Sequence, residues 1–173
     1  MTRAARLDLR SFQQELATRL ATKTAAQVES SRLGLSCAGE RWLVRLADAG
    51  EVIAVPQIVK VPMTRRWFLG LANVRGSLYS VIDFAAFLGH EPVASGGLAR
   101  LILLGPRTGE LNAGIVVERV AGLRNLAELT AVPPLDGAPE WHAQRWADAE
   151  GNAWQEIDLG ALARDPAFLQ VST

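Results

Sequence analysis

The sequence predicts a mainly β protein of two small barrel-like lobes that share one core and follow an N-terminal helix. From residue 33 onward, short apolar runs alternate with turn-forming residues, which is typical of strands joined by tight turns. The ends of the two halves of the chain also read alike, at an offset of 75 positions. One half alone has too little apolar area for a stable core, so we expect both halves to fold as one unit.

Residues 1–32 are predicted to form an N-terminal helix and a linker. Four apolar residues recur at spacings of three, four and four, which places them on one helical face. They are Leu9, Phe12, Leu16 and Leu20. Residues 22–32 show no clear period and are expected to be the linker. Two roles stay open for the helix: packing on its own domain, or docking on a partner.

The next part of the chain is expected to contain six short strands and one short helix. Gly39 lies at the bend of the first hairpin. Pro56 and Pro62 flank the fourth strand and limit its pairing, because proline cannot donate to a sheet ladder. Asp83 can cap a helix over residues 84–88. The expected strands are 33–37, 41–46, 52–55, 57–61, 67–72 and 78–82.

The second half is expected to contain two hairpins and a last helix. Residues 133–139 form a loop rich in proline and glycine between the hairpins. Asp158 can cap a helix that runs to about Arg164. The expected strands are 100–104, 111–117, 145–148 and 152–157.

An internal repeat links the two halves. Residues 76–88 and 151–163 share a glycine, an aromatic residue, an Ile-Asp pair and the apolar positions after it, although two similar strand–helix turns could also coincide by chance. In each, a strand ends in Ile-Asp and the aspartate accepts from a free N–H of the next helix. We therefore expect one domain over residues 33–173, with lobes of roughly 33–95 and 96–165 that either stay separate or exchange strands.

Composition excludes several classes of protein. The 173 residues carry 18 basic and 18 acidic side chains, and this neutrality argues against a nucleic-acid binder. The neutrality hides an asymmetry of +3 over residues 1–36, +2 over 37–132 and −5 over 133–173. The single cysteine, Cys37, excludes an internal disulfide framework. No run approaches the roughly 18 apolar residues of a membrane helix and no secretory signal is present, so we expect a cytoplasmic protein without membrane insertion.

Catalytic, cofactor-binding and metal-ligating residues are not predicted. Nucleotide-binding, metalloprotease and serine-hydrolase motifs are absent. His90 and His142 are expected to be exposed loop residues, Cys37 a small buried apolar residue, and Asp83 and Asp158 helix caps rather than a catalytic pair. An enzyme that uses His142 with an acid is the alternative from another functional class.

Arg75 is the residue that these observations single out for binding. It is the one charged residue between Arg66 and Asp83, and Gly76 after it suggests a turn with positive φ that would lift the guanidinium off the sheet. A planar head with five donors beside apolar surface is a good anchor for a protein partner. The alternative is an arginine that forms an ion pair within its own domain.

Several motifs in this order resemble the signature of CheW-like coupling domains. The signature typically reads Gly-Val-x-Asn-Leu-Arg-Gly, then Pro-Val-Ile-Asp-Leu. Its counterparts here are Val61-Pro62, Gly70, Asn73-Val-Arg-Gly76 and Val81-Ile-Asp-Phe84. The chain departs from the signature at Val74, which replaces the usual Leu, and at Ser80, which replaces the usual Pro. The similarity extends from about Leu33 to Leu162.

Four details resemble the type IV pilus, twitching-motility branch of this family, the PilI-type adaptors. They are the N-terminal helix and residues 72–76, 84–89 and 165–168. The acidic stretch 136–150 matches the family poorly.

The resemblance implies two intertwined, five-stranded SH3-like barrels and a function without catalysis. Such a domain is an adaptor that joins a methyl-accepting chemoreceptor to a CheA-type histidine kinase beside membrane receptor arrays, with no cofactor. Receptor contact is implied for Asn73, Val74, Arg75, Gly76 and, in an apolar groove between the lobes, Val120. Kinase contact is implied for Glu51 and Val52. The alternatives are a flagellar chemotaxis coupling protein and an SH3-like peptide-binding module outside chemotaxis.

Overall fold

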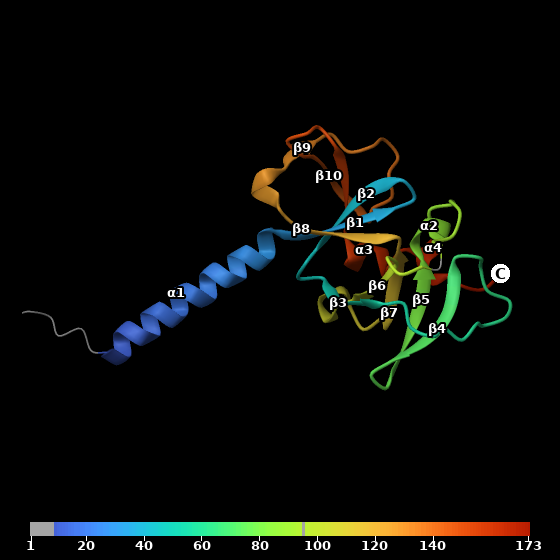
Figure 1. The fold of residues 1–173 in the computed structure, drawn as a ribbon, viewed down its shortest axis with the longest axis horizontal. Coiled ribbons are helices and arrows are strands. Elements are labelled where there is room, and N and C mark those ends of the chain that lie inside the picture. Colours follow the sequence, from blue (N-terminus) through green and yellow to red (C-terminus); the bar gives the residue numbers. More distant parts are fainter. Residues whose placement is uncertain (1–8, 95) are drawn as a thin grey trace, which may run out of the picture.

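A computed structural model describes residues 9–94 and 96–173 as two β-sheets with a long helix leading into them (Figure 1). The predicted mainly β class and the N-terminal helix are confirmed. The helices are α1 (Leu9–Ser30), α2 (Phe84–Phe87), α3 (Leu159–Leu162) and α4 (Pro166–Leu169). The strands are β1 (Ser31–Cys37), β2 (Glu40–Arg45), β3 (Ala49–Ala54), β4 (Phe68–Val74), β5 (Ser77–Asp83), β6 (Arg100–Leu104), β7 (Ala113–Val117), β8 (Arg119–Asn125), β9 (Thr130–Val132), β10 (His142–Ala147) and β11 (Ala153–Ile157).

Helix α1 is longer than expected, because the segment predicted as a linker continues the helix to Ser30. Alanine and long unbranched side chains favour this, and the hydroxyls of Thr18, Thr22 and Thr24 donate to carbonyls four residues earlier at 2.8 Å. The side chains of residues 13–29 are exposed, and α1 extends away from the sheets (Figure 1). The side chains of residues 13–29 therefore do not pack into the core of the domain, and those of Leu9 and Phe12 lie outside the described part.

The base of α1 is fixed to the body by charged side chains. Arg32 Nε lies 2.7 Å from Glu156 Oε1, and both side chains are buried. Arg32 Nη1 also donates to the carbonyl of Glu29, one of the free acceptors at the end of the helix, at 2.7 Å. Glu29 in turn forms an ion pair with Arg107 at 2.7 Å. These contacts set the direction in which α1 leaves the domain.

Each half of the chain contributes one hairpin to the sheet that the other half otherwise forms. The six-stranded sheet has the order β8-β1-β2-β11-β10-β9, and the five-stranded sheet has the order β3-β6-β7-β5-β4. The β1–β2 hairpin pairs in parallel with β11 of the second half, while the β6–β7 hairpin pairs in parallel with β5 of the first half. The six-stranded sheet has one strand more than the five expected in each barrel, because the three-residue strand β9 adds to the edge at β10. Each sheet therefore depends on both halves.

The repeat seen in the sequence is a structural repeat. Asp83 follows β5 and caps α2 through a bond from Ala86 N to its Oδ1 at 2.9 Å. Asp158 follows β11 and caps α3 through a bond from Ala161 N at 2.8 Å. Both capping predictions are confirmed, and the two strands occupy matching places in their sheets.

Several expected elements differ from the structure. Residues 57–61 do not form a strand; they make one isolated bridge, between Val59 and Leu71, because Pro56 and Pro62 limit pairing on either side. The structure adds β8, β9 and α4, which the pattern of apolar residues did not indicate. Strand β8 is an edge strand with mostly exposed side chains, so it lacks the alternation that marks a half-buried strand.

The main core lies between the sheets. It joins residues of β1, β2, β4, β5, β6, β7 and β11 to α2, α3 and α4, and its largest fully buried members include Leu35, Phe84, Ile115 and Ile157. The ring of Trp42 packs edge-on to Phe84, with centroids 5.1 Å apart. A second cluster lies on the other face of the five-stranded sheet. Its buried members are Ala72, Val81, Leu101, Leu103 and Val116.

Candidate functional site

The β4–β5 hairpin presents Arg75 at its tip. Arg75 and Gly76 both have positive φ, 52° and 88°, so the predicted turn is confirmed and includes the arginine itself. Two consecutive left-handed residues form the turn that suits the twist of a hairpin. The Asn73 carboxamide oxygen accepts from Gly76 N at 2.9 Å and holds the turn. The Arg75 side chain is 78% exposed, free of the sheet as expected.

Arg75 meets Glu51, so the alternative of an ion pair within its own domain is observed, although its partner was not foreseen. Arg75 Nη2 donates to Glu51 Oε1 at 2.6 Å. Glu51 lies on β3, which is one edge of the five-stranded sheet, while β4 is the other edge. An ion pair between elements at opposite edges requires the sheet to curl, so this lobe closes toward a barrel around the second cluster. The hairpin tip implied for the receptor and Glu51, implied for the kinase, therefore lie on one surface.

The remaining predicted site residues are divided between the lobes. Val52 is 38% exposed on β3, next to Glu51, and pairs with Ile102. Val74 is partly buried against the second cluster, so it supports the hairpin from inside. Val120 lies on β8 of the other sheet, opposite Leu35, and packs against the main core. The structure brings Asn73, Arg75 and Gly76 to the lobe of Glu51, and leaves Val120 on the second lobe.

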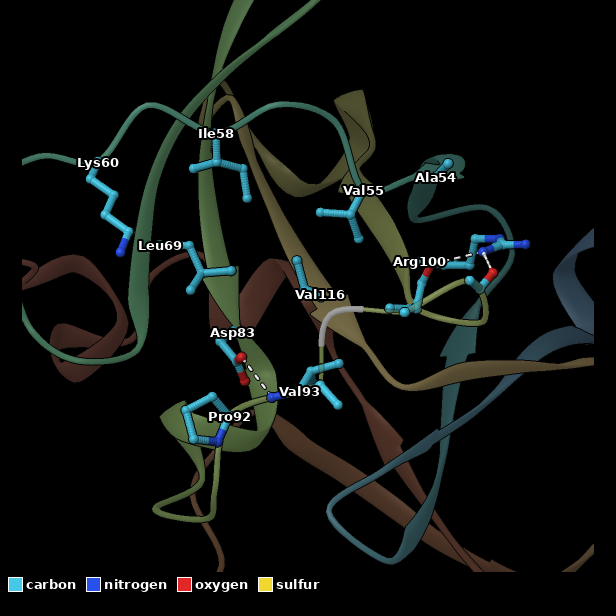
Figure 2. Close-up of a pocket in the computed structure, with 14 residues that line it drawn as sticks. Ala54, Val55, Ile58, Lys60, Leu69, Asp83, Pro92, Val93, Arg100 and Val116 are labelled. Atoms are coloured by element: carbon cyan, nitrogen blue, oxygen red, sulfur yellow. Dashed lines mark hydrogen bonds between the residues drawn. The ribbon is translucent and has the colours of Figure 1, made fainter.

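A cavity of about 650 Å³ opens on the same lobe, and sequence reasoning missed it (Figure 2). Val55, Ile58 and Val93 give it apolar walls, and Lys60 and Arg100 lie at its opposite ends. Its walls come from the β3–β4 connection and from the loop before β6, which lie about 40 residues apart in the sequence. The only signal for it was the apolar run around Pro56, which was expected to be strand.

Asp83 connects the wall of this cavity to helix α2. Its Oδ1 accepts from Ala86 N, and its Oδ2 accepts from Val93 N at 2.8 Å (Figure 2). The carboxylate is 1% exposed and both of its oxygens have partners. Asp83 therefore organises the cavity wall and is not arranged as an acid or base for a ligand.

The side chains that could take part in catalysis have structural roles. Cys37 is fully buried, as predicted, and desolvation raises the pKa of its thiol to about 12. His142 is partly buried at the start of β10, not in an exposed loop; its ring lies edge-on to Trp141 and Trp42, with centroids 4.2 and 5.3 Å away. His90 is exposed, as expected. Among residues 9–94 and 96–173, no three His, Cys, Asp or Glu side chains gather as a metal site.

Cys37 is expected to resist alkylation in the folded protein. At pH 8, the raised pKa lowers the thiolate fraction about a thousandfold relative to an exposed cysteine, and burial blocks access as well. Mass spectrometry after a pulse of iodoacetamide should show labelling of guanidinium-unfolded protein and almost none of native protein. Rapid labelling without denaturant would contradict this placement.

His142 is expected to make the protein less stable in mild acid. Burial lowers its pKa below the ordinary value of 6.5, so the folded state resists a proton that the unfolded state accepts. Its contribution is therefore fully present above about pH 6.5 and is lost progressively as the pH falls below that value. Urea denaturation at about pH 7.5 and at about pH 5 should show that His142→Gln loses less unfolding free energy on acidification than the natural sequence does. Equal losses would contradict this.

Comparison with known proteins places most of the chain in one set of relatives. The profile of the CheW-like domain matches residues 32–167. Protein PilI of Pseudomonas aeruginosa is 29% identical over 161 residues, which span 89% of each chain. Protein FrzA of Myxococcus xanthus is 30% identical over 105 residues, 59% of this chain and 64% of FrzA.

A solved structure has the same fold. The scaffolding protein TtCheW of Thermoanaerobacter tengcongensis superimposes with a TM-score of 0.62 at 21% identity, over 75% of this chain and 89% of that one. Among the described residues, no helix has the length and apolar character needed to span a membrane. The profile match confirms the predicted family resemblance, and the solved structure confirms the fold.

Proposed function

Because the chain belongs to the CheW-like domain family, we propose that it is a non-enzymatic adaptor that couples a methyl-accepting chemoreceptor to a CheA-type histidine kinase. The pathway would control twitching motility by type IV pili, from the cytoplasmic side of membrane receptor arrays. The family profile over residues 32–167 and the similarity to PilI over most of both chains support this. The burial of Cys37 and the packing of His142 favour a role without catalysis.

The binding surfaces of this adaptor are the β4–β5 tip and β3. Asn73, Val74, Arg75 and Gly76 contact the receptor, together with Val120 on the other lobe. The exposed side chain of Arg75 and its left-handed backbone conformation support this, since a guanidinium that stands off the surface can donate to an acceptor on a partner helix. Glu51 and Val52 contact the kinase, and the half-exposed carboxylate beside an apolar residue suits the rim of such an interface.

The ion pair between Arg75 and Glu51 is the observation that carries the coupling role. Its 2.6 Å contact joins the hairpin tip that we assign to the receptor to the strand that we assign to the kinase. A receptor state that attracts Arg75 more strongly removes the partner of Glu51 and so changes the charge that faces the kinase. Coupling needs only that the two receptor states differ in the free energy with which they bind this surface.

Co-purification tests the proposal. Tagged protein should retain both the cytoplasmic tip of its receptor and the kinase, and deletion of the gene should abolish twitching while swimming continues. Loss of swimming alone would support the flagellar alternative instead. Retention of neither receptor nor kinase would overturn the proposal.

A further inference from the structure

A groove of about 530 Å³ lies between segments that come from the two halves of the chain. Trp67, Phe87 and Leu88 of the first half line it together with Pro139 and Trp141 of the second. Of the described residues that line the groove, none belongs to the β4–β5 tip or to β3. It is therefore separate from the surfaces that we assign to the receptor and to the kinase.

The walls of the groove are aromatic rings in mutual contact. Trp67 and Trp141 each lie against Phe87, with ring centroids 5.3 and 6.0 Å from its own, so the two indoles are at most about 11 Å apart. Phe168 stacks on Trp67 at 6.3 Å and packs edge-on to Phe87 at 5.4 Å. Because these rings support one another, the groove is formed before any ligand binds.

Each of the two indoles brings an N–H group that has no acceptor. The other three tryptophans donate to acceptors within the chain at 2.8 to 3.2 Å, as indole N–H groups inside proteins usually do. Among the described residues, Nε1 of Trp67 and Nε1 of Trp141 have no such partner, and neither atom is buried. Both donors are therefore free for a ligand.

The backbone carbonyls of the same walls are already used. Those of Trp67 and Trp141 accept from backbone N–H groups at 2.8 and 2.9 Å. The carbonyl of Pro139 accepts from another at 2.9 Å, and that of Gln170 accepts from Arg65 Nε at 2.8 Å. A ligand that fits these walls therefore brings acceptors and few donors of its own.

We propose that this groove binds a proline-rich segment of another protein in the polyproline II conformation. Such a segment has no internal hydrogen bonds, so its carbonyls are open acceptors, and each proline lacks the N–H that these walls could not satisfy. It advances about 9 Å in three residues, which suits two indole donors at most about 11 Å apart. Aromatic-lined grooves are a recognised docking surface for this conformation.

Other kinds of segment fit the groove less well. A helix uses its carbonyls for its own hydrogen bonds and so offers few to the indoles. A strongly charged segment finds no excess of opposite charge, because Arg65 and Asp165 line the groove with opposite signs. His142 also lines it, but burial lowers the pKa of this side chain, so the ring is neutral at pH 7.

Titration of the full chain with decaproline tests the proposal by two-dimensional nitrogen–proton NMR. The five tryptophans give five indole N–H signals. Decaproline should shift the signals of Trp67 and Trp141 and leave the other three, whose N–H groups are bonded within the chain. The loss of one signal in Trp67→Phe and of another in Trp141→Phe assigns the two. We expect a Kd between about 10 µM and 1 mM.

Two comparisons make the result specific. Trp67→Phe keeps an aromatic ring but removes one donor, so it should weaken binding about three- to tenfold. Trp146→Phe is the matched control, since Trp146 is also half-buried but donates to Glu156 at 2.8 Å outside the groove, and binding should not change. A flexible glycine–serine peptide of the same length should bind at least about tenfold more weakly than decaproline. Thermal unfolding checks that each variant is folded.

Three results would overturn the proposal. They are no shift at about 2 mM decaproline, equal shifts of all five indole signals, and equal binding of decaproline by Trp67→Phe. Equal binding of the glycine–serine peptide would also overturn it, because any extended backbone would then suffice. Co-purification with receptor and kinase does not depend on this groove, so either proposal can fail without the other.

Discussion

Arg75→Glu is expected to weaken binding of the receptor tip at least about thirtyfold, as the loss of a central arginine anchor does in other interfaces. The substitution removes five donors from the hairpin tip and places a carboxylate beside Glu51. The fold should not change, because Arg75 is 78% exposed and buries no partner. Isothermal titration with a receptor-tip peptide measures the binding, and thermal unfolding checks the fold.

Arg66→Glu is the matched control for this experiment. Arg66 is also exposed and also forms an ion pair, with Glu91 at 2.9 Å, but it lies outside the predicted receptor surface. Arg66→Glu makes the same change of charge as Arg75→Glu, and binding of the receptor tip should survive it. Equal losses in the two variants would mean that net charge, and not the hairpin tip, attracts the receptor.

Exchanging the charges of the ion pair separates its two roles. A double variant with Glu51→Arg and Arg75→Glu can form the pair again but offers the receptor a carboxylate. We expect it to restore the stability of the hairpin and not the binding of the receptor tip. Recovery of receptor binding would show that the ion pair, rather than the guanidinium, is what the receptor needs.

Glu156→Ala is expected to lower the free energy of unfolding by about 3–5 kcal/mol, because it leaves Arg32 charged and buried without its counter-charge. The indole N–H of Trp146 also loses its acceptor, Glu156 Oε2, at 2.8 Å. The main loss is the desolvated charge that stays behind, since Arg45, at 3.5 Å, is half exposed and can turn to solvent. Equilibrium unfolding in urea measures the change.

Two further variants make the result specific. Glu91→Ala breaks an exposed ion pair and should change the unfolding free energy by no more than about 0.5 kcal/mol. Replacing both buried partners, Arg32→Met with Glu156→Leu, should recover most of the loss, because no charge then stays buried. A loss below about 1 kcal/mol for Glu156→Ala would mean that water reaches Arg32 in the folded state.

Local signals in the sequence were sufficient for the elements that depend on neighbouring residues. The hairpin at Gly39, the turn at Gly76 and the caps at Asp83 and Asp158 were all predicted, and the structure confirms them. Each involves a few consecutive residues whose backbone angles and hydrogen bonds follow from residue type. The repeat was visible for the same reason, since its unit is one strand, one aspartate and one helical turn.

Local signals failed where the outcome depended on distant partners. Residues 22–29 lack an apolar period because their side chains are exposed, so a test for amphipathic helices could not find this part of α1. Residues 57–61 are apolar enough for a strand, but they line a cavity wall and make only the bridge to Leu71.

Local side-chain chemistry specifies which residues turn and which cap a helix, because those choices depend on a few neighbouring positions. The tertiary structure alone decided which half completes which sheet and that Arg75 reaches Glu51, 24 residues away. Hydrophobic patterning says that a strand is buried, but not which strand lies beside it. The exchange of hairpins between the halves, and the surface that it closes, are therefore properties of the folded chain.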